Sequence, residues 1–326
     1  MHPDATVADL AAEAIGHRPV LLHPLIESLQ PQPGKTVVDA TFGGGGVTAA
    51  LAERVAPGGV VVAIDRDPDA ISRAQARFSR LPGTVIIEQG DFADLSSILA
   101  RHGIDSVAAV TLDLGLSSLQ LDDAERGFSF QLDGPLDMRL DRRGQRLTAA
   151  DVLNSRSEAE LAKLLRTFGD ETFARQIARE IVRQRRERPL RTTHQLRRAV
   201  ERAIPRRHWP KRIHPATRTF QALRIEVNHE LDSLERALQA AITALQPGGR
   251  IGVISFHSLE DTLVKNALNV AAKDCVCPPQ QPICTCAHRA SLSLVSRKAI
   301  KPDASEIAAN PRARSARLRI AEKRAA

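Results

Sequence analysis

The sequence predicts an α/β fold in which a parallel sheet is interrupted by an inserted helical domain. Strand and helix signals alternate from residue 36 to about residue 119, a pattern typical of a parallel sheet. From residue 148 to residue 203 the apolar period is helical. The N-caps of this helical block are expected at Thr148, Ser157 and Thr193. Strand character returns only at residues 251–256, after a predicted helix over 231–245, so the helical block separates two parts of one sheet.

Residues 37–65 form the most informative segment of the chain. An apolar strand ends at Asp39, four glycines begin at Gly43, and a helix then leads to a second apolar strand that ends at Asp65. Glycine permits positive φ and leaves the backbone open to a ligand, while the helix directs its free N–H groups and positive end at the loop. An acidic residue about 20 positions further on typically binds ribose hydroxyls. This layout predicts a nucleoside-cofactor site.

Two cofactor classes use this layout, dinucleotides and S-adenosylmethionine, and Asp39 favours the second. Its carboxylate would repel a pyrophosphate but attract the cationic methionine end of S-adenosylmethionine, directly or through water. Phe92 follows the next strand, where an adenine would lie, and Asp113 ends the strand that faces the reacting centre. A turn or a helix cap is the ordinary role of one acidic strand end. Four strand ends in register instead favour a Rossmann-like class I S-adenosylmethionine-dependent methyltransferase sheet.

Composition sets the domain plan. The chain has 326 residues, of which 43% are hydrophobic, so a globular protein with ample core is expected. It contains neither an apolar run of membrane-spanning length nor a secretory signal, which predicts a cytoplasmic protein without a membrane partner. The plan has four parts: an N-terminal extension (1–16), a first core part (17–121), an inserted loop and helical substrate-recognition domain (122–213), and a second core part with a cysteine cluster and a basic tail (214–326).

Positive charge is concentrated in the helical block. The net charge is +8, yet residues 175–212 alone hold 14 Lys or Arg against 3 Asp or Glu. A solvated helix face is the ordinary explanation of such a run, whereas this concentration favours a polyanionic partner. Aromatic residues make up only 3% and tyrosine is absent, so extensive base stacking along a single strand is not supported.

Several long blocks carry a family resemblance. They are TFGGGG (41–46), DLGLSSLQLDD (113–123) with RGFSF (126–130) and DGPLDMR (133–139), HPATRTFQALRI (214–225), ISFHSLED (254–261) and NPRARS (310–315). Together they resemble the bacterial 16S ribosomal RNA cytosine N4-methyltransferase family, known as RsmH or MraW. The resemblance runs from residue 17 to the C-terminal region.

The resemblance implies N4-methylation of a cytidine in the decoding centre, with 16S ribosomal RNA within the small ribosomal subunit as partner and S-adenosyl-L-methionine as cofactor. The family's cofactor positions correspond here to Gly45, Gly46, Val47, Asp65, Phe92, Asp113 and Gln120. The chain departs from the family pattern at three places: Val47-Thr48 stands where His-Ser is usual, Leu119 replaces a usual proline, and His23-Pro24 replaces all or part of a usual acidic pair. The oligomeric state stays open, a dimer included.

The chemistry of methyl transfer points to further residues. The lone pair of a cytosine amine is delocalised into the ring, so the amine needs acceptors that localise the pair and receive its proton. We expect Asp113, Ser117 and Ser118 to frame the amine. Asp137 either closes the pocket from its loop or is a structural carboxylate satisfied by backbone N–H groups. Residues expected on the substrate side are Arg139, His214, Arg218, Gln221 and His257, with capping or core roles as the alternative.

Four cysteines form two Cys-x-Cys pairs, at Cys275 and Cys277 and at Cys284 and Cys286. Disulfides are not expected in a cytosolic enzyme. Four thiolates could bind a structural zinc ion tetrahedrally, although these pairs are tighter than the common Cys-x-x-Cys hairpins. Free thiols are the first expectation and structural zinc is the alternative.

Two other function classes compete with the enzyme. An RNA-binding ribosome-assembly factor with weak or no catalysis would explain the departures at Val47 and Leu119. A nicotinamide dehydrogenase would require a pyrophosphate beside Asp39 and a hydride-transfer constellation that the sequence lacks. Intact acids at Asp39, Asp65 and Asp113 favour the methyltransferase.

Overall fold

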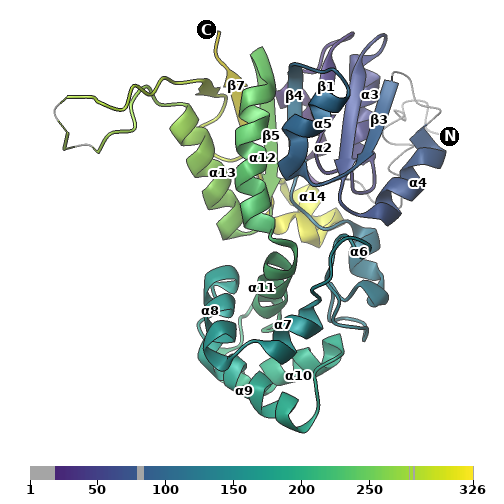
Figure 1. Ribbon diagram of the computed structural model, residues 1–326, viewed down its shortest axis with the longest axis vertical. Coiled ribbons are helices and arrows are strands. Elements are labelled where there is room, and N and C mark those ends of the chain that lie inside the picture. Colours follow the sequence, from purple (N-terminus) through teal and green to yellow (C-terminus); the bar gives the residue numbers. More distant parts are fainter. Residues whose placement is uncertain (1–18, 79–83, 279, 282, 326) are drawn as a thin grey trace. The chain divides into compact units, whose positions relative to one another are not determined.

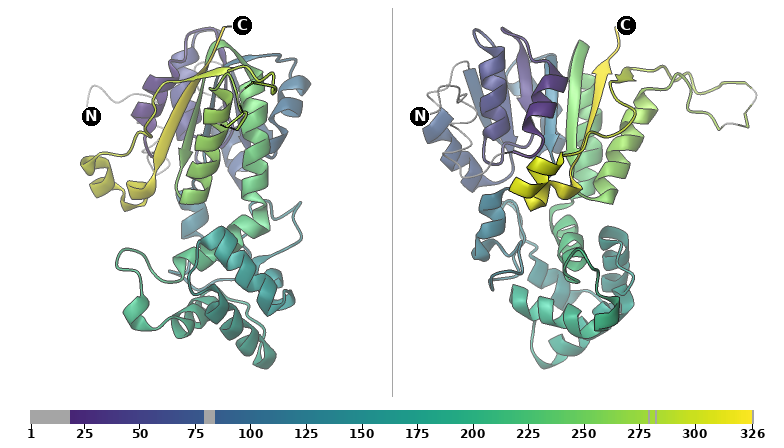
Figure 2. Two further views of the ribbon diagram at one scale, coloured as in Figure 1. Left: turned by 90° about the vertical axis from the view of Figure 1, so that its left-hand side faces the viewer. Right: turned by 180° about the vertical axis from the view of Figure 1, so that it is seen from behind.

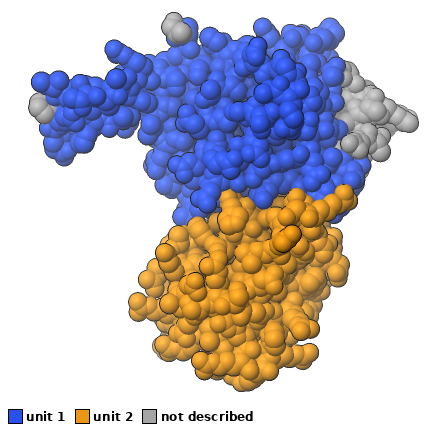
Figure 3. Space-filling view, viewed as in Figure 1, with its two compact units in different colours: residues 1–115, 231–326 blue, residues 116–230 orange. Residues whose placement is uncertain are grey.

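The computed structural model describes residues 19–78, 84–278, 280–281 and 283–325. The predicted N-terminal extension, 1–16, lies outside these residues. The chain divides into two compact units, one comprising residues up to Gly115 together with Leu231–Ala326, the other Leu116–Glu230 (Figure 3). None of the helices in the described part of the chain has the length and apolar character needed to cross a bilayer.

The first unit is built on a seven-stranded sheet in the order β3-β2-β1-β4-β5-β7-β6 (Figure 1). The strands are β1 (Thr36–Asp39), β2 (Val60–Asp65), β3 (Thr84–Gln89), β4 (Val107–Asp113), β5 (Leu245–Ser255), β6 (Leu292–Leu294) and β7 (Arg317–Lys323). Strands β1 to β5 are parallel to their neighbours, and β7 runs antiparallel to both β5 and β6. This topology confirms the predicted Rossmann-like α/β fold.

Strands β6 and β7 were not predicted from the sequence, which indicated only a cysteine cluster and a basic tail in this region. β6 has only three residues, too few for a periodic signal. In β7, apolar Leu318 and Ile320 are buried while Arg317 is exposed, so the strand follows the two-residue alternation of a sheet. The alternation covers only residues 317–320, since Ala321 is buried next to Ile320, and the arginines of this short stretch gave the segment its basic composition.

Helices cover both faces of the sheet, giving three layers (Figure 2). The helices of this unit are α2 (Leu22–Leu29), α3 (Gly46–Val55), α4 (Pro68–Phe78), α5 (Leu95–Arg101), α12 (Glu230–Ala244), α13 (Ser258–Ala271) and α14 (Ala304–Ala309). Val38 packs with α5, α12 and α13 in one core, whereas its neighbour Val37 packs with α2 and α3 in the other. Adjacent strand residues therefore serve opposite cores, as the pleat requires.

The strand order reverses between β1 and β4. From β1 the chain proceeds outward to β2 and β3, and then returns to place β4 on the other side of β1. In open α/β sheets the ligand crevice lies at such a reversal, outside the carboxyl ends of the strands. The two strands at the reversal end in Asp39 and Asp113.

The second unit is helical and has its own core. Its helices are α6 (Ser118–Asp122), α7 (Ala149–Ser155), α8 (Glu158–Gly169), α9 (Ala174–Glu187), α10 (Thr193–Ala203) and α11 (Thr217–Asn228). Capping boxes confirm Thr148 and Ser157 as N-caps. The third N-cap is Thr192, not the predicted Thr193. The Thr193 hydroxyl is occupied elsewhere, since it accepts from the N–H of Gly134 and donates to the carbonyl of Leu132.

This unit extends beyond the predicted insertion of 122–213 at both ends. On the C-terminal side, α11 contributes Phe220, Leu223 and Val227 to the helical core. At the end of α11, the buried Asn228 side chain donates to the Met138 carbonyl and accepts from the Leu140 N–H, each at 2.8 Å. Because α11 shares the core of the inserted helices, it belongs with them rather than with the sheet.

Candidate active site

The site begins where β1 and β4 end. The loop after β1 is attached to β4, because the Ala40 N–H donates to the Thr111 carbonyl at 2.9 Å. The Asp113 N–H in turn donates to the Thr41 hydroxyl at 2.7 Å. Thr41 therefore fixes the two acidic strand ends relative to each other. Sequence reasoning missed this residue, although a hydroxyl side chain directly ahead of the glycine loop is a signal that could have identified it.

Asp39 is a buried carboxylate that accepts hydrogen bonds from Thr48 and Thr41. It is 1% exposed, accepts from the Thr48 hydroxyl at 2.6 Å, and accepts from the Thr41 N–H at 3.3 Å. Burial raises the pKa of Asp39 to about 6, and the negative charge of Asp65 raises it further. The hydrogen bonds from Thr48 and Thr41 lower it. A cation in the crevice would favour the ionised form, as the predicted sulfonium cofactor requires.

The glycine loop has the conformation that a close ligand approach needs. Gly43 and Gly45 have φ values of 52° and 83°, in the left-handed region that favours glycine. α3 begins at Gly46 without a side-chain cap from Gly45. The Val47 side chain is buried in the core with α2, so only its backbone can contact a ligand. The departure from the family's usual histidine therefore places an apolar side chain in the protein interior.

Asp65 ends β2 and faces the same loop. Its carboxylate accepts from the Gly43 N–H at 2.7 Å and from the Asp67 N–H at 2.8 Å. Carboxylate oxygens only accept hydrogen bonds, and a ribose hydroxyl pair supplies donors of the kind that Asp65 already accepts from these amides. Asp65 is half-buried, which leaves it accessible from the crevice.

Phe92 follows β3 and starts a short 3-10 helix, Phe92–Asp94. Its ring packs against the core on one side and is half-buried. The preceding Asp91 accepts from the Ala93 N–H and from the Ser233 hydroxyl, both at 2.9 Å, and lies 3.4 Å from the Arg66 guanidinium. Asp91 therefore fixes the backbone that presents Phe92.

Asp113 is partly exposed, and its pKa is raised. Burial raises the pKa of Asp113 to about 7, against the hydrogen bond from the Gly115 N–H and together with the negative charges of Asp39 and Glu260. A Cβ at Gly115 would lie 2.8 Å from the Phe256 ring, so no side chain fits at that position beside the carboxylate. A carboxylate with a pKa near 7 is suited to receive a proton at neutral pH.

His257 has a local structural partner. It is the N-cap of α13, with Nδ1 accepting from the Glu260 N–H at 3.4 Å and Nε2 lying 2.8 Å from Glu260 Oε1. Glu260 is itself buried and accepts from the Phe256 N–H at 2.8 Å. His257 therefore caps α13, as the alternative to substrate binding predicted, and substrate binding by this residue stays a prediction.

Ser117, Ser118 and Gln120 lie in the helical unit. Ser117 and Gln120 form the capping box of α6, in which each side chain bonds the backbone N–H of the other. Leu119 lies within α6, so the departure from the family's proline is accommodated in a capped helix. The predicted roles of these residues beside Asp113 stay predictions.

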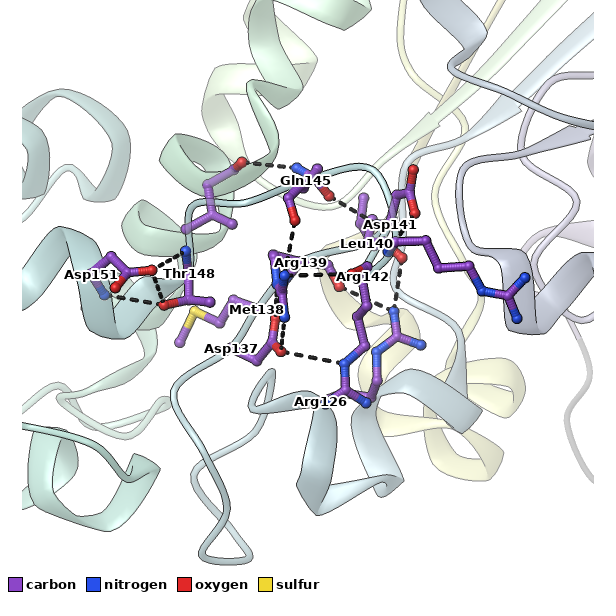
Figure 4. Close-up of polar contacts among 12 residues, drawn as sticks. Arg126, Asp137, Met138, Arg139, Leu140, Asp141, Arg142, Gln145, Thr148 and Asp151 are labelled. Atoms are coloured by element: carbon purple, nitrogen blue, oxygen red, sulfur yellow. Dashed lines mark hydrogen bonds and ion pairs between the residues drawn. The ribbon is translucent and has the colours of Figure 1, made fainter.

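Asp137 is held by two arginine side chains and by one backbone N–H group, that of Arg139 at 3.1 Å, which is the kind of partner predicted for a structural carboxylate. Its Oδ1 lies 2.7 Å from Arg139 Nε and its Oδ2 lies 2.8 Å from Arg139 Nη2, with Arg142 Nε at 3.3 Å (Figure 4). Arg139 also donates to the Gln145 carbonyl at 2.8 Å. Burial opposes ionisation, but the Arg139 hydrogen bonds and charge prevail and hold the pKa of Asp137 below its usual value. The catalytic role of Asp137 stays a prediction.

The three residues predicted around the start of α11 also have partners inside the helical unit. His214 Nε2 lies 3.1 Å from Glu201 Oε1. Arg218 Nη1 donates to the Asp170 carbonyl at 2.8 Å, and Gln221 donates to the Phe168 carbonyl at 3.0 Å. Arg218 retains further donors for a phosphate or a base edge, since a guanidinium has five.

Comparison with known proteins decides the family. The model of the MraW methylase family matches residues 14–324. The chain belongs to the MraW methylase family. It is 49% identical to the ribosomal RNA small subunit methyltransferase H of Syntrophotalea carbinolica, over 95% of this chain and 98% of that one. It is 48% identical to the protein of the same name from Trichlorobacter lovleyi, over 95% and 99%. This MraW-family chain is a methyltransferase, as predicted, and S-adenosyl-L-methionine is its methyl donor.

The residues at the strand ends fit that cofactor. Asp39 is a buried acid that gains from a neighbouring cation, and Asp65 offers acceptors next to the glycine loop. Gly43 and Gly45 have positive φ and no side chain, which allows a ligand to approach the backbone closely. A pyrophosphate in the same place would face two carboxylates, which argues against a dinucleotide.

Proposed function

We propose that this chain methylates the N4 amine of a cytidine in the RNA of the small ribosomal subunit, at the decoding centre and in the cytoplasm. The relatives at 48–49% identity carry the name ribosomal RNA small subunit methyltransferase H. The observation that carries the proposal is the half-buried Asp113 at the strand-order reversal, with a pKa near 7 and with Asp39 on the adjacent strand. This arrangement supports transfer to a weakly basic nitrogen.

S-adenosylmethionine supplies an electrophilic methyl group on a sulfonium. On the protein side, the Asp113 carboxylate accepts a hydrogen bond from the cytosine amine and so localises the nitrogen lone pair. As the new N–C bond forms, the bond between the methyl carbon and the sulfonium would break and leave a neutral thioether, and one amine proton would pass to the Asp113 carboxylate, whose raised pKa favours its uptake. In the proposal, Ser117 and Ser118 accept from the second amine hydrogen.

Asp39, Asp65 and Phe92 hold the donor in position. Asp39, fixed by Thr48, faces the methionine end, and Asp65 accepts from the ribose hydroxyls. Phe92 contacts the adenine with its exposed ring face. Orientation of two bound reactants lowers the barrier by roughly 7–11 kcal/mol, which is the main contribution that a methyl transfer requires of its enzyme.

The helical unit is suited to bind the RNA backbone. Helices α9 and α10 line a cavity of about 190 Å³ whose wall includes Arg183, Arg188, Arg198 and Arg202. Arg183 is paired with Glu180 and Glu187. The other three are exposed, and none has a carboxylate partner within 4.0 Å among the described residues. Unpaired arginines around a concave surface are typical of phosphate contacts. This arginine-lined cavity supports the proposed substrate-recognition role of the unit.

Transfer to ribosomal RNA tests the proposal. Small subunits from cells lacking this enzyme are incubated with the chain and S-adenosylmethionine, and modified nucleosides are mapped by mass spectrometry. We expect N4-methylcytidine at one position with the parent protein, and its loss with Asp113→Ala. Asp105→Asn is the matched control, because Asp105 is exposed and precedes the amino end of the same strand. Wild-type transfer by Asp113→Ala would remove this residue from the mechanism.

A further inference from the structure

The four cysteines lie in one long loop of the first unit. This loop joins α13 to β6 across residues 272–291 and extends away from both elements in Figure 1. Loops of this length without secondary structure are uncommon unless function or an internal constraint maintains them. None of the hydrogen bonds described for Asp39, Asp65 or Asp113 involves this loop.

The loop has no apolar core of its own. No described residue between positions 272 and 291 is buried. Its two large aliphatic side chains are open to solvent, Val276 at 44% and Ile283 at 74% exposure. Apolar burial therefore cannot offset the conformational entropy of ordering this segment. Another interaction has to hold the two Cys-x-Cys pairs together.

The four sulfur atoms converge on one point. All four Sγ atoms lie within 4.8 Å of one another. Cys284 and Cys286 are 3.6 Å apart, and Cys286 and Cys275 are 3.8 Å apart. A tetrahedral zinc ion with Zn–S bonds of about 2.3 Å places its ligands about 3.8 Å from each other. Two of the sulfur–sulfur distances match the edge of that tetrahedron, and the others do not exceed 4.8 Å.

Backbone amides face two of the sulfurs. The Val276 N–H donates to Cys286 Sγ, and the Cys277 N–H donates to Cys275 Sγ, each at 3.4 Å. Such donors stabilise the negative charge of metal-bound thiolates and orient them. The first bond also connects the two Cys-x-Cys pairs across the loop.

We propose that Cys275, Cys277, Cys284 and Cys286 bind one structural zinc ion that closes this loop. An all-sulfur tetrahedral set selects zinc over magnesium or calcium, which prefer oxygen ligands. Two disulfides are the competing outcome, because they would use the same four atoms. They would join the sulfurs in two pairs, whereas here Cys286 has two other sulfurs at nearly equal distance.

Metal content and thiol chemistry test the site. The untagged full chain is purified under reducing conditions and its zinc is measured by mass spectrometry. We expect one zinc per chain in the parent and in Val276→Ala, which keeps the backbone N–H, and at most about a tenth of that in Cys284→Ser. A thiol reagent should release the zinc as four thiols react. Zinc retained at the parent level by Cys284→Ser would overturn the proposal.

A second measurement needs no variant. The metal-stripped, reduced parent is titrated with CoCl₂ and followed by visible absorption. The proposal requires the spectrum of tetrahedral thiolate cobalt, saturating at one cobalt per chain and lost when ZnCl₂ is added. A parent that takes up neither metal, or that is isolated under alkylating conditions with two disulfides, would also overturn it.

Discussion

Thr48 donates a hydrogen bond of 2.6 Å to Asp39, from the first turn of α3 to the end of β1. Both residues are buried, so this contact is part of the interior rather than of the solvated surface. It orients the carboxylate toward the loop and stabilises its ionised form against burial. The hydroxyl stands where the family usually has serine, and the chain therefore keeps the donor despite the departure at Val47.

Thr48→Val should weaken S-adenosylmethionine binding. Loss of the donor raises the pKa of Asp39 further, so less of the carboxylate is ionised to face the cofactor's cation. A hydrogen bond to a charged group contributes about 1.5–3 kcal/mol, which predicts a loss of roughly 10- to 100-fold in affinity by calorimetry. Thr48→Ser retains the hydroxyl and is the control. Equal affinities for Thr48→Val and the parent would show that Asp39 does not need this donor.

Methyl transfer should depend on the ionisation of Asp113. With a pKa raised to about 7, the carboxylate is protonated on the acid side and cannot accept from the amine. We expect kcat/KM to fall as pH drops through about 7. The apparent pKa of this acid limb of the pH–rate profile belongs to the Asp39–Asp113 pair, because the two charges interact. Asp113→Asn should leave only a low, flat profile. A parent profile without an acid limb between pH 5 and 8 would contradict this assignment.

The same two carboxyls should make the cofactor-free protein less stable as pH rises. Their ordinary pKa of 3.8 is raised to about 6 for Asp39 and about 7 for Asp113 in the folded state. The folded form thus holds protons that the unfolded chain has released, and this stabilisation is lost as pH rises from about 4 to about 7. Asp113→Asn does not titrate, so its free energy of unfolding should exceed that of the parent at pH 8, with the difference shrinking toward pH 4. Urea unfolding at both pH values measures it.

Much of the site was predictable because strand ends have a simple geometry. Parallel strands in alternating order bring their carboxyl ends to one edge, so Asp39, Asp65 and Asp113 could be grouped from sequence alone. Thr41 and Thr48 were missed, although a hydroxyl side chain beside a glycine loop is a signal for such contacts. Their roles depend on which hydroxyl meets which acid in three dimensions.

The helical unit was predictable in composition but not in its contacts. The apolar period and the capping residues predicted the helical block over 148–203, which holds α7 to α10. The partners of Asp137 instead depended on the local path of the loop at Met138, which has a positive φ of 62°. β7 was missed because its alternation of charged and apolar residues covers only residues 317–320 before Ala321 interrupts it. Short-range patterns fix helices, while a strand at the end of a chain is recognised only through the neighbour with which it pairs.

Breaking the Asp137–Arg139 ion pair should lower the free energy of unfolding, whether or not it also lowers kcat. Both side chains are largely buried, with exposures of 8% and 19%, and the pairing is bidentate. Arg139→Gln removes two donors from the carboxylate but leaves Arg142 Nε at 3.3 Å, so the loss should lie below the roughly 3–5 kcal/mol of a fully unpaired buried charge. Urea unfolding should register this change, with exposed Arg143→Gln as control. If Asp137 is catalytic, Asp137→Asn will lower kcat in protein that is fully folded; an unchanged kcat there would leave Asp137 only its structural role.

Removing unpaired arginines from the α9–α10 cavity should weaken RNA binding in a salt-dependent way. Each phosphate contact contributes about 0.7–0.9 to the slope of log affinity against log salt concentration. Arg198→Gln and Arg202→Gln should each lower that slope by roughly this amount while S-adenosylmethionine affinity stays at the parent value. Arg183→Gln is the matched control, since Arg183 lines the same cavity but is neutralised by Glu180 and Glu187. Filter binding of small-subunit RNA over a salt series measures the slope. Equal slopes for the parent and both variants would place the RNA on another surface, because arginines that release no counterions on binding contact no phosphate.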